Sequence, residues 1–242
     1  MRILITGAYG FVGTNLCHYL VSRGHSCDAL DIYEAQSDGV GYEASYTWDD
    51  LSNKNTLIPF SEYDAIVHLA GKAHDLKKVA SVQSYFDINV GLTEKIFNAS
   101  YGKVPRFIYF SSSKASKDGN AYGRSKYAAE GFLDGRAIIL RPAMIHGRGN
   151  KGNLNLLWKL AKFGFPWPLA AFENKRSFSS IQNVCISVES LCERGVNGIY
   201  PIADDETLST NRIIELIAEA CGKKPHLWHL SKRIMRGFAK LG

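Results

Sequence analysis

The sequence predicts an α/β fold built on a doubly wound parallel sheet, with a small C-terminal lobe. A short apolar run at residues 2–6 leads through a glycine-spaced turn into a segment with helical apolar periodicity. Further apolar runs then alternate with segments of helical length. This alternation is typical of parallel strands joined by right-handed crossovers. The 242 residues suffice for one such domain and a small appendage.

The turn after the first strand spaces its glycines as Gly7-x-x-Gly10-x-x-Gly13. Gly7 permits the tight turn, Gly10 lets a pyrophosphate approach the backbone, and Gly13 lets the helix pack close to the strand. The free N–H groups at the helix start then face the phosphates. Because a strand precedes this turn and a helix follows it, we expect a dinucleotide site here rather than an ordinary glycine turn.

An acidic residue lies near the end of the second expected strand, at residues 27–32. Asp31 follows Gly13 by 18 residues, close to the ~20-residue offset at which a carboxylate meets the adenosine ribose. Such a carboxylate accepts hydrogen bonds from both ribose hydroxyls and repels a 2′-phosphate. We therefore expect NAD rather than NADP, and the alternative is an aspartate that only forms a turn.

A firm apolar strand is expected at residues 65–71, and its last residues are small. Leu69, Ala70 and Gly71 let a cofactor lie across the sheet edge. His68 lies inside the apolar run, so we interpret it as a core histidine rather than a ligand. A short strand at 46–48, a helix at 83–100 and a buried strand at 106–110 complete this part of the pattern.

Tyr122 and Lys126 lie four residues apart at the start of an expected helix, so they share one helix face. Tyrosine ordinarily ionises near pH ~10. A neighbouring ammonium and a cationic nicotinamide are expected to lower the pKa of Tyr122. The pair can then take a proton from a sugar hydroxyl while hydride leaves for the cofactor. The alternative is an exposed helix with an aromatic–lysine contact.

Composition narrows the function further. No apolar run reaches the ~20 residues of a membrane span, and the strand at residue 2 leaves no room for a cleaved targeting peptide. Five scattered cysteines without a CxxC pair favour a reducing cytoplasm and argue against a zinc site or a disulfide framework. The net charge of +6 suits an anionic substrate. No basic and aromatic recognition motif favours nucleic acid.

Taken together, these motifs resemble the extended short-chain dehydrogenase/reductases, in particular the NAD-dependent epimerase/dehydratase family acting on nucleotide sugars. The resemblance covers nearly the whole chain, and the ordered set is far more specific than any single motif. The matching pieces are the glycine turn, Asp31, Asp50-Leu51, His68-Leu69-Ala70-Gly71, Asn89, the serines at 111–113, Tyr122-x-x-x-Lys126, Arg141-Pro142, residues 145–149 and Arg176-Ser177-Phe178.

The resemblance implies a catalytic role for three residues. Tyr122 is the acid/base, and Lys126 holds the nicotinamide ribose and tunes Tyr122. Ser112 is the third member, with Ser113 as the fallback and as a substrate contact, because consecutive serines blur the register. The implied cofactor contacts are Gly7, Tyr9, Gly10, Phe11, Val12, Gly13, Asp31, Ile32, Asp50, Leu51, Leu69, Ala70, Gly71, Asn89, Tyr122, Lys126 and Pro142.

The resemblance also implies a substrate site in the C-terminal part. Asn153 and Leu154 match the segment that touches a uracil ring, and Arg176 matches the arginine that reaches the substrate diphosphate. The alternative for Arg176 is a solvated loop arginine. Departures from the family are the short loop at 114–121, His146 in place of a tyrosine, Asn183 in place of an acid, and an early chain end.

We expect residues 1–149 to form the NAD-binding Rossmann domain, with 177–200 returning to its sheet. Residues 150–176 and 201–242 form the small substrate lobe. In the C-terminal part of the chain we expect a helix at 154–163, a last strand at 198–202, and a helix at 211–221 capped by Ser209 or Thr210. The basic, amphipathic stretch 230–241 is interpreted as a packed terminal helix rather than a membrane contact.

The expected function is epimerisation of a UDP-hexose at C4 with bound NAD in the cytoplasm, through a 4-keto intermediate. A nucleotide-sugar 4-ketoreductase of polysaccharide synthesis is the alternative, although Asp31 weighs against it because net reductions usually draw on NADPH. A non-catalytic NAD-binding regulatory module is the alternative of another class. We expect a nucleotide-sugar partner, a homodimer by resemblance only, no nucleic acid, no integral membrane segment and no metal.

Overall fold

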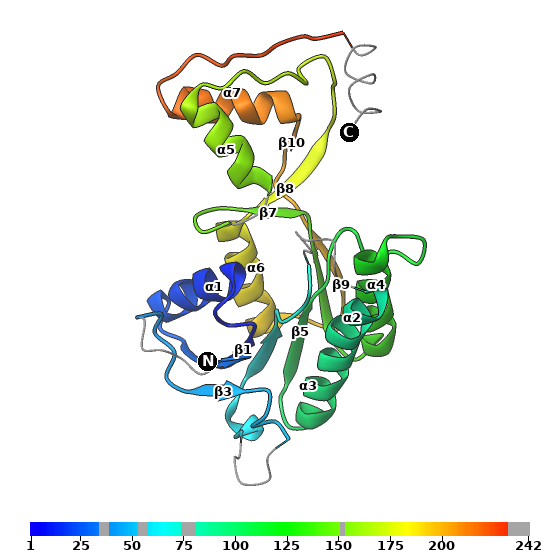
Figure 1. The fold of residues 1–242 in the computed structure, drawn as a ribbon. Coiled ribbons are helices and arrows are strands. Elements are labelled where there is room, and N and C mark those ends of the chain that lie inside the picture. Colours follow the sequence, from blue (N-terminus) through cyan, green and yellow to red (C-terminus); the bar gives the residue numbers. More distant parts are fainter. Residues whose placement is uncertain (34–38, 53–57, 74–80, 151–152, 232–242) are drawn as a thin grey trace. The chain divides into compact units, whose positions relative to one another are not determined.

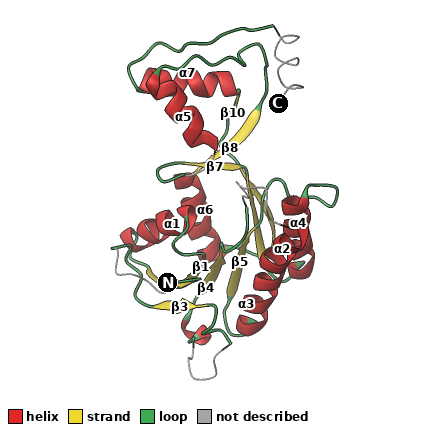
Figure 2. Ribbon diagram, viewed as in Figure 1, coloured by secondary structure: helices red, strands yellow, loops and turns green. Residues whose placement is uncertain are grey.

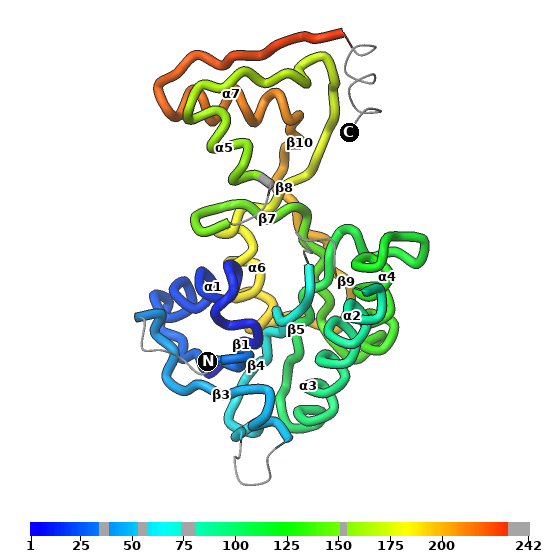
Figure 3. The backbone as a smooth tube through the Cα atoms, in the orientation of Figure 1, coloured from blue at the N-terminus to red at the C-terminus, as the bar shows by residue number. Residues whose placement is uncertain are grey.

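The computed structural model describes residues 1–33, 39–52, 58–73, 81–150 and 153–231 and divides the chain into two compact units. The first unit comprises Met1–Ala143 and Ile181–Ile202, and the second comprises Met144–Ser180 and Ala203–Gly242. Figure 3 follows the backbone through both units. The division after Ala143 is earlier than the expected residue 149, because the next strand pairs outside the main sheet.

The first unit is built on a seven-stranded sheet in the order β3-β2-β1-β4-β5-β6-β9. All of its neighbouring strands are parallel. The strands are β1 Arg2–Thr6, β2 Ser26–Asp31, β3 Ser45–Thr47, β4 Ala65–His68, β5 Arg106–Phe110, β6 Ile138–Pro142 and β9 Gly198–Ile202. The order reverses at β1 and β4, which is the switch point where open α/β sheets bind ligands. The predicted doubly wound sheet is confirmed.

Helices cover both faces of this sheet (Figures 1 and 2). On one face α1, Phe11–Ser22, packs against α6, Ile181–Arg194. The other face carries α2, Val82–Phe86, α3, Leu92–Ser100, and α4, Ala121–Leu133. Leu4, Ile66, Ile96 and Leu133 are fully buried members of the core that includes α3 and α4. Burying each such side chain contributes about 1.5–3 kcal/mol.

Two elements of this unit differ from the sequence expectation. The expected helix at 83–100 consists of α2, a π-helical turn at Asp87–Gly91 and α3. The expected strand at 65–71 ends at His68, because Ala70 N donates to the side chain of Thr6 at 3.2 Å instead of extending the sheet ladder. The predicted strands at 2–6, 27–32, 46–48, 106–110 and 198–202 lie within one residue of β1, β2, β3, β5 and β9, whereas no bounds were predicted for β6 and α6.

The second unit contains a small sheet in the order β10-β8-β7 and two helices that pack together. Its strands are β7, Met144–His146, β8, Arg176–Ser180, and β10, Thr207–Leu208, and its helices are α5, Asn153–Phe163, and α7, Thr210–Ala220. Ser209 caps α7, since its side chain accepts a hydrogen bond from Arg212 N at 3.0 Å. Gly222, with φ +66°, follows the helix end.

Most of the terminal stretch 230–241 lies outside the described residues. Among the helices that the structure does describe, none combines the length and the apolar character needed to cross a bilayer.

Candidate active site

The glycine turn at the end of β1 has the geometry that its sequence predicts. Gly7 has φ +67°, and a Cβ there would lie 2.8 Å from Ala70 N. A Cβ on Gly13 would lie 2.5 Å from the carbonyl oxygen of Ala8. Gly10 is the N-cap of α1 with no side-chain capping bond and no acid in the first turn. The first N–H groups of α1 therefore suit a dinucleotide diphosphate.

Asp31 lies at the end of β2, beside this turn. Its Oδ2 accepts a hydrogen bond from Tyr9 N at 2.9 Å, and its Oδ1 accepts one from Ile32 N at 2.7 Å. Tyr9 is held in turn by a contact of its hydroxyl with Ser45 Oγ at 3.1 Å. The carboxylate is thereby fixed next to the glycine turn, which is the position that a ribose-binding acid requires.

The other candidates of the first unit gather around the carboxyl ends of the parallel strands. Asp50 follows β3 and accepts hydrogen bonds from Thr47 N at 2.7 Å and Thr47 Oγ1 at 2.9 Å. Pro142 ends β6, and its carbonyl accepts from Ser113 N at 3.0 Å. Half-buried residues complete this set, namely Phe11, Val12, Leu51, Leu69 and Ala70.

Asn89 connects the end of β4 to α4. It is fully buried in the π-helical turn. Its Oδ1 accepts from Lys72 N at 2.7 Å, and its Nδ2 donates to Lys72 O at 3.1 Å and to Ser125 Oγ at 2.9 Å. A Cβ on Gly71 would lie 2.8 Å from Asn89 Oδ1 and 3.2 Å from Lys126 Nζ, so a side chain at this position would crowd both groups.

The start of α4 brings Tyr122 and Ser112 together. A hydrogen bond with Ser112 lowers the pKa of the half-buried Tyr122, although burial, the larger effect, raises it overall. Ser112 is buried, whereas Ser113 is exposed. The geometry therefore favours Ser112 over Ser113 as the serine beside Tyr122.

Lys126 lies one helical turn beyond Tyr122 and is buried. Its Nζ donates to the carbonyl oxygen of Phe110 at 2.7 Å and lies 4.7 Å from the centre of the Tyr109 ring. Burial lowers the pKa of Lys126 to about 7. Contrary to the sequence expectation, Lys126 is not one of the groups that lower the pKa of Tyr122. A buried lysine with this pKa is only partly charged at neutral pH.

His68 is a core residue, as predicted. It is fully buried on β4, and its Nδ1 and Nε2 contact Thr6 Oγ1 at 2.6 Å and Thr93 Oγ1 at 2.9 Å. Burial lowers the pKa of His68 to about 3, so its ring is neutral at physiological pH.

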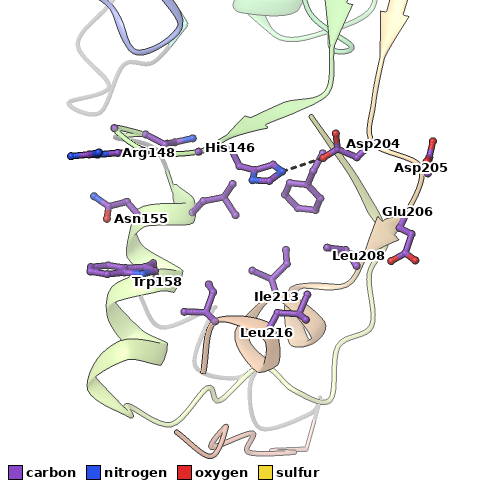
Figure 4. A pocket seen from close by; sticks show the side chains of 16 residues that line it. His146, Arg148, Asn155, Trp158, Asp204, Asp205, Glu206, Leu208, Ile213 and Leu216 are labelled. Atoms are coloured by element: carbon purple, nitrogen blue, oxygen red, sulfur yellow. Dashed lines mark hydrogen bonds and ion pairs between the residues drawn. The ribbon is translucent and has the colours of Figure 1, made fainter. Parts of the chain in front are cut away.

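The second unit contains a pocket of about 940 Å³ (Figure 4). Its apolar lining includes Leu154, Phe178 and Leu216. Arg148 and Trp158 lie on one side, and the acidic residues of the segment 204–206 lie on the opposite side. A large apolar pocket with few charged groups at its rim is typical of a small-molecule site.

A histidine–aspartate pair fixes one wall of this pocket. His146 Nε2 and Asp204 Oδ2 are 3.1 Å apart, as Figure 4 shows by a dashed line. Asp204 Oδ1 also accepts from Ser180 N at 3.0 Å. These contacts hold the end of β7, the end of β8 and the segment before β10 together.

The predicted substrate residues are only partly brought to this pocket. Leu154 lines it, whereas Arg176 is exposed at the start of β8 and is not part of the lining. Asn153 is the first residue of α5, and its side chain lies outside the described part of the structure.

The sequence profile of the NAD dependent epimerase/dehydratase family matches residues 3–155, which is more than half of the chain. The chain belongs to this family. It is therefore an enzyme of the epimerase/dehydratase type, and its cofactor is NAD, which the glycine turn and Asp31 fit.

Individual relatives of this epimerase/dehydratase agree with the assignment. The UDP-glucose 4-epimerase of Vibrio cholerae is 28% identical over 91% of this chain and 76% of its own length. The N-acetyl-alpha-D-glucosaminyl-diphospho-ditrans,octacis-undecaprenol 4-epimerase of Escherichia coli O157:H7 is 25% identical over 95% and 75%. The UDP-2-acetamido-2,6-beta-L-arabino-hexul-4-ose reductase of Pseudomonas aeruginosa is 32% identical over 64% and 38%.

Among solved structures, UDP-N-acetylglucosamine 4-epimerase from Bacillus cereus matches with a TM-score of 0.76 and 24% identity. The match covers 94% of this chain and 84% of that chain. At this identity the likeness concerns the fold.

Sequence reasoning missed several residues that line the pocket of this epimerase/dehydratase. Trp158 follows Leu154 by four residues on α5, so helical periodicity places both on one face. Arg148 lies in the matching segment 145–149, but the sequence did not assign its side chain a role in the pocket. The pairing of His146 with Asp204 joins positions 58 residues apart, and no local pattern indicates it.

Proposed function

We propose that this enzyme interconverts UDP-hexoses by epimerisation at C4 through a 4-keto form of the sugar. One observation carries the proposal: the buried Ser112 lies beside Tyr122, whose pKa it lowers, and Lys126 follows one turn further along α4. This cluster follows β5, in the same sheet whose β1 leads into the glycine turn. Two of the relatives described above are 4-epimerases, which supports the choice of reaction.

Each residue of the cluster has a defined task in this reaction. NAD, when bound, supplies the acceptor and donor of the hydride. Ser112 hydrogen-bonds the sugar oxygen at C4, and Tyr122 removes the proton from that oxygen and later returns it. A charged Lys126 stabilises the phenolate of Tyr122. Epimerisation results when hydride returns to the opposite face of the sugar.

The pocket of the second unit is proposed to bind the nucleotide part of the substrate. Trp158 offers a flat aromatic face and Leu154 an apolar contact for a base, and Arg148 offers a guanidinium for a phosphate. In this proposal Arg148 joins the predicted Arg176 as a diphosphate contact. The expected homodimer and the cytoplasmic location remain predictions.

The proposal is tested by purifying the protein, extracting its bound nucleotide, and mixing it with a panel of UDP- and dTDP-sugars followed by mass spectrometry and chromatography. We expect NAD in the extract and interconversion of UDP-glucose and UDP-galactose without added cofactor. Bound NAD without conversion of any sugar in the panel would contradict the proposal.

A 4-ketoreductase is the second candidate, because the Pseudomonas aeruginosa relative is a reductase of a 4-keto UDP-sugar. A reductase consumes one equivalent of NADH for each 4-keto sugar, whereas an epimerase regenerates its cofactor in every cycle. Stoichiometric loss of NADH with a 4-keto sugar, in the absence of epimerisation, would favour the reductase.

A further inference from the structure

The second unit exposes large apolar side chains on one side of α5. Leu156 is 59% exposed and Phe163 is 65% exposed, and Phe165, directly after the helix, is 58% exposed. Leu156 and Phe163 are seven residues apart, so they lie on one side of the helix together with the exposed Lys159 between them. Single exposed apolar residues are ordinary, but three in one short segment indicate a contact surface.

The opposite side of α5 faces the interior of its own unit. Leu154 and Trp158 line the pocket, and Ala161 is buried, so these residues form a row at four-residue and three-residue steps. The row of Leu156 and Phe163 lies about half a turn away from it. One helix therefore presents one row to the pocket and the core and the other row to solvent.

The segment after α7 runs beside the end of α5 and adds further exposed residues. Lys223 Nζ donates to the carbonyl oxygen of Lys162, and Trp228 N donates to that of Trp167 at 2.9 Å. Lys223 is exposed, and Trp228 is 54% exposed. The aromatic–lysine face is defined as Leu156, Lys159, Phe163, Phe165, Lys223 and Trp228.

Charge in this part of the chain has one sign. The stretches 150–172 and 221–242 contain nine of the 29 Lys and Arg and none of the 23 Asp and Glu. The rest of the chain has 20 basic and 23 acidic residues, so the net charge of +6 arises in these two stretches. On α7, Glu215 and Glu219 are paired with Arg212 at 3.1 Å and 3.3 Å rather than with these lysines. The aromatic–lysine face therefore suits an anionic surface.

We propose that the aromatic–lysine face docks on an anionic lipid bilayer. Phenylalanine and tryptophan enter the zone between headgroups and acyl chains, while lysine stems lie along it with their ammonium groups at the lipid phosphates. Nucleic acid is less favoured, because arginine is absent from the described residues 153–172 and 221–231 and Leu156 offers no ring for a base to stack on. Since the other row of α5 lines the pocket, docking holds the pocket close to the bilayer.

The test is sedimentation of the whole 242-residue chain with vesicles of phosphatidylcholine and phosphatidylglycerol, and with vesicles of phosphatidylcholine alone. We expect binding to the anionic vesicles that weakens as salt is added, and little binding to the others. Phe163→Ser/Phe165→Ser is expected to weaken the binding at least about tenfold, because it removes two inserted rings. Lys159→Gln/Lys223→Gln is expected to weaken it about tenfold or more, because it removes two attracted charges.

Matched controls come from exposed residues of the first unit. Tyr101→Ser/Val196→Ser removes two apolar side chains that are 64% and 70% exposed. Lys95→Gln/Lys103→Gln removes two charges that are also exposed. Both controls are expected to bind anionic vesicles as the wild type does. Because every substituted residue is exposed, all four variants are expected to fold, which circular dichroism checks.

Failure of the wild type to bind anionic vesicles at low salt overturns the inference. Equal binding by the face variants and the controls also overturns it, and assigns the lipid contact to another part of the chain. Retention on DNA without vesicle binding, or self-association that the face variants abolish, assigns the face to nucleic acid or to a second copy. The proposed function fails separately, when the wild type converts no nucleotide sugar, whether or not it binds vesicles.

Discussion

At the scale of single residues, polar groups in this enzyme have different tasks according to what surrounds them. His68 and Lys126 are both buried, and burial lowers the pKa of each. His68 is satisfied by two threonine hydroxyls, so it stays neutral and belongs to the core. Lys126 contacts a carbonyl and an aromatic face at the sheet edge, so its charge is adjustable and can serve catalysis.

His68 makes the free energy of unfolding depend on pH. The unfolded chain protonates this histidine below pH ~6.5, whereas the folded protein resists protonation until about pH 3. The contribution of the neutral His68 to the free energy of unfolding is therefore fully present above pH ~6.5. It declines by about 1.4 kcal/mol per unit as pH falls toward 3. Urea unfolding of His68→Gln should show this slope missing relative to wild type. An identical slope would contradict the account, and His18→Gln, at an exposed position of α1, is the control.

Two helical glycines offer a matched comparison of backbone approach. Gly13→Ala places a methyl group 2.5 Å from the carbonyl oxygen of Ala8, and we expect a loss of about 1–3 kcal/mol with weaker NAD binding. Gly131 in α4 has no atom within 4 Å of such a methyl group, so Gly131→Ala should stabilise the protein by roughly 0.5–1 kcal/mol. Calorimetry with and without NAD measures both, and equal effects would refute the packing argument.

At the scale of elements, the helical segment from 82 to 100 differs most from a regular helix. Its π-helical turn at Asp87–Gly91 directs Asn89 inward, where it bonds the backbone of Lys72 and the side chain of Ser125. Such turns are frequent at functional sites. This one connects the segment after β4 to the helix that carries Tyr122 and Lys126.

Asn89→Ala is expected to destabilise the protein by roughly 2–4 kcal/mol, because it removes two hydrogen bonds to the half-buried backbone of Lys72 and one to the buried Ser125. Amide hydrogen exchange in the segments around Gly71 and α4 should accelerate. Gln83→Ala removes an exposed bond to Asp87 in the same helical segment and should stay within about 0.5 kcal/mol of wild type. Comparable losses in both variants would argue against a special role for Asn89.

At this scale the sequence predicts those features that depend on residues close together in the chain. The glycine turn and the four-residue spacing of Tyr122 and Lys126 depend on neighbouring residues alone, so the pattern is sufficient. Asn89 in the π-helical turn bonds to Lys72, 17 residues away in the sequence. The apolar periodicity of the sequence does not predict this contact between distant residues.

At the scale of the whole molecule, the order of the motifs along the chain predicts two parts. The boundary between them depends on which strands pair with each other. The strand Met144–His146 directly follows the main sheet in sequence, yet it pairs with Arg176–Ser180 in the second unit. The sequence also does not predict which side chains of the second unit line its pocket. Arg176 belongs to the matched motif but is exposed at the start of its strand, while Arg148 lines the pocket.

Hydrogen exchange should separate the tasks of the two units. We expect NAD to slow exchange around Gly7–Gly13, Gly71 and the start of α4 in the first unit. A UDP-sugar added afterwards should slow exchange at residues 146–150, 154–158 and 204–217, which include residues that line the pocket. Ligand binding at ~100 times Kd adds about 2.7 kcal/mol of stability, enough to detect. Protection of the second unit by NAD alone would contradict this division of roles.

The central claim, that Tyr122 moves the proton of the sugar hydroxyl, is tested most directly by turnover of UDP-glucose in Tyr122→Phe. Tyr127→Phe, an exposed tyrosine of the same helix, is the control. We predict that Tyr122→Phe retains NAD but loses turnover by about 10²–10⁴-fold, while Tyr127→Phe stays near wild type. Wild-type turnover in Tyr122→Phe would contradict the account.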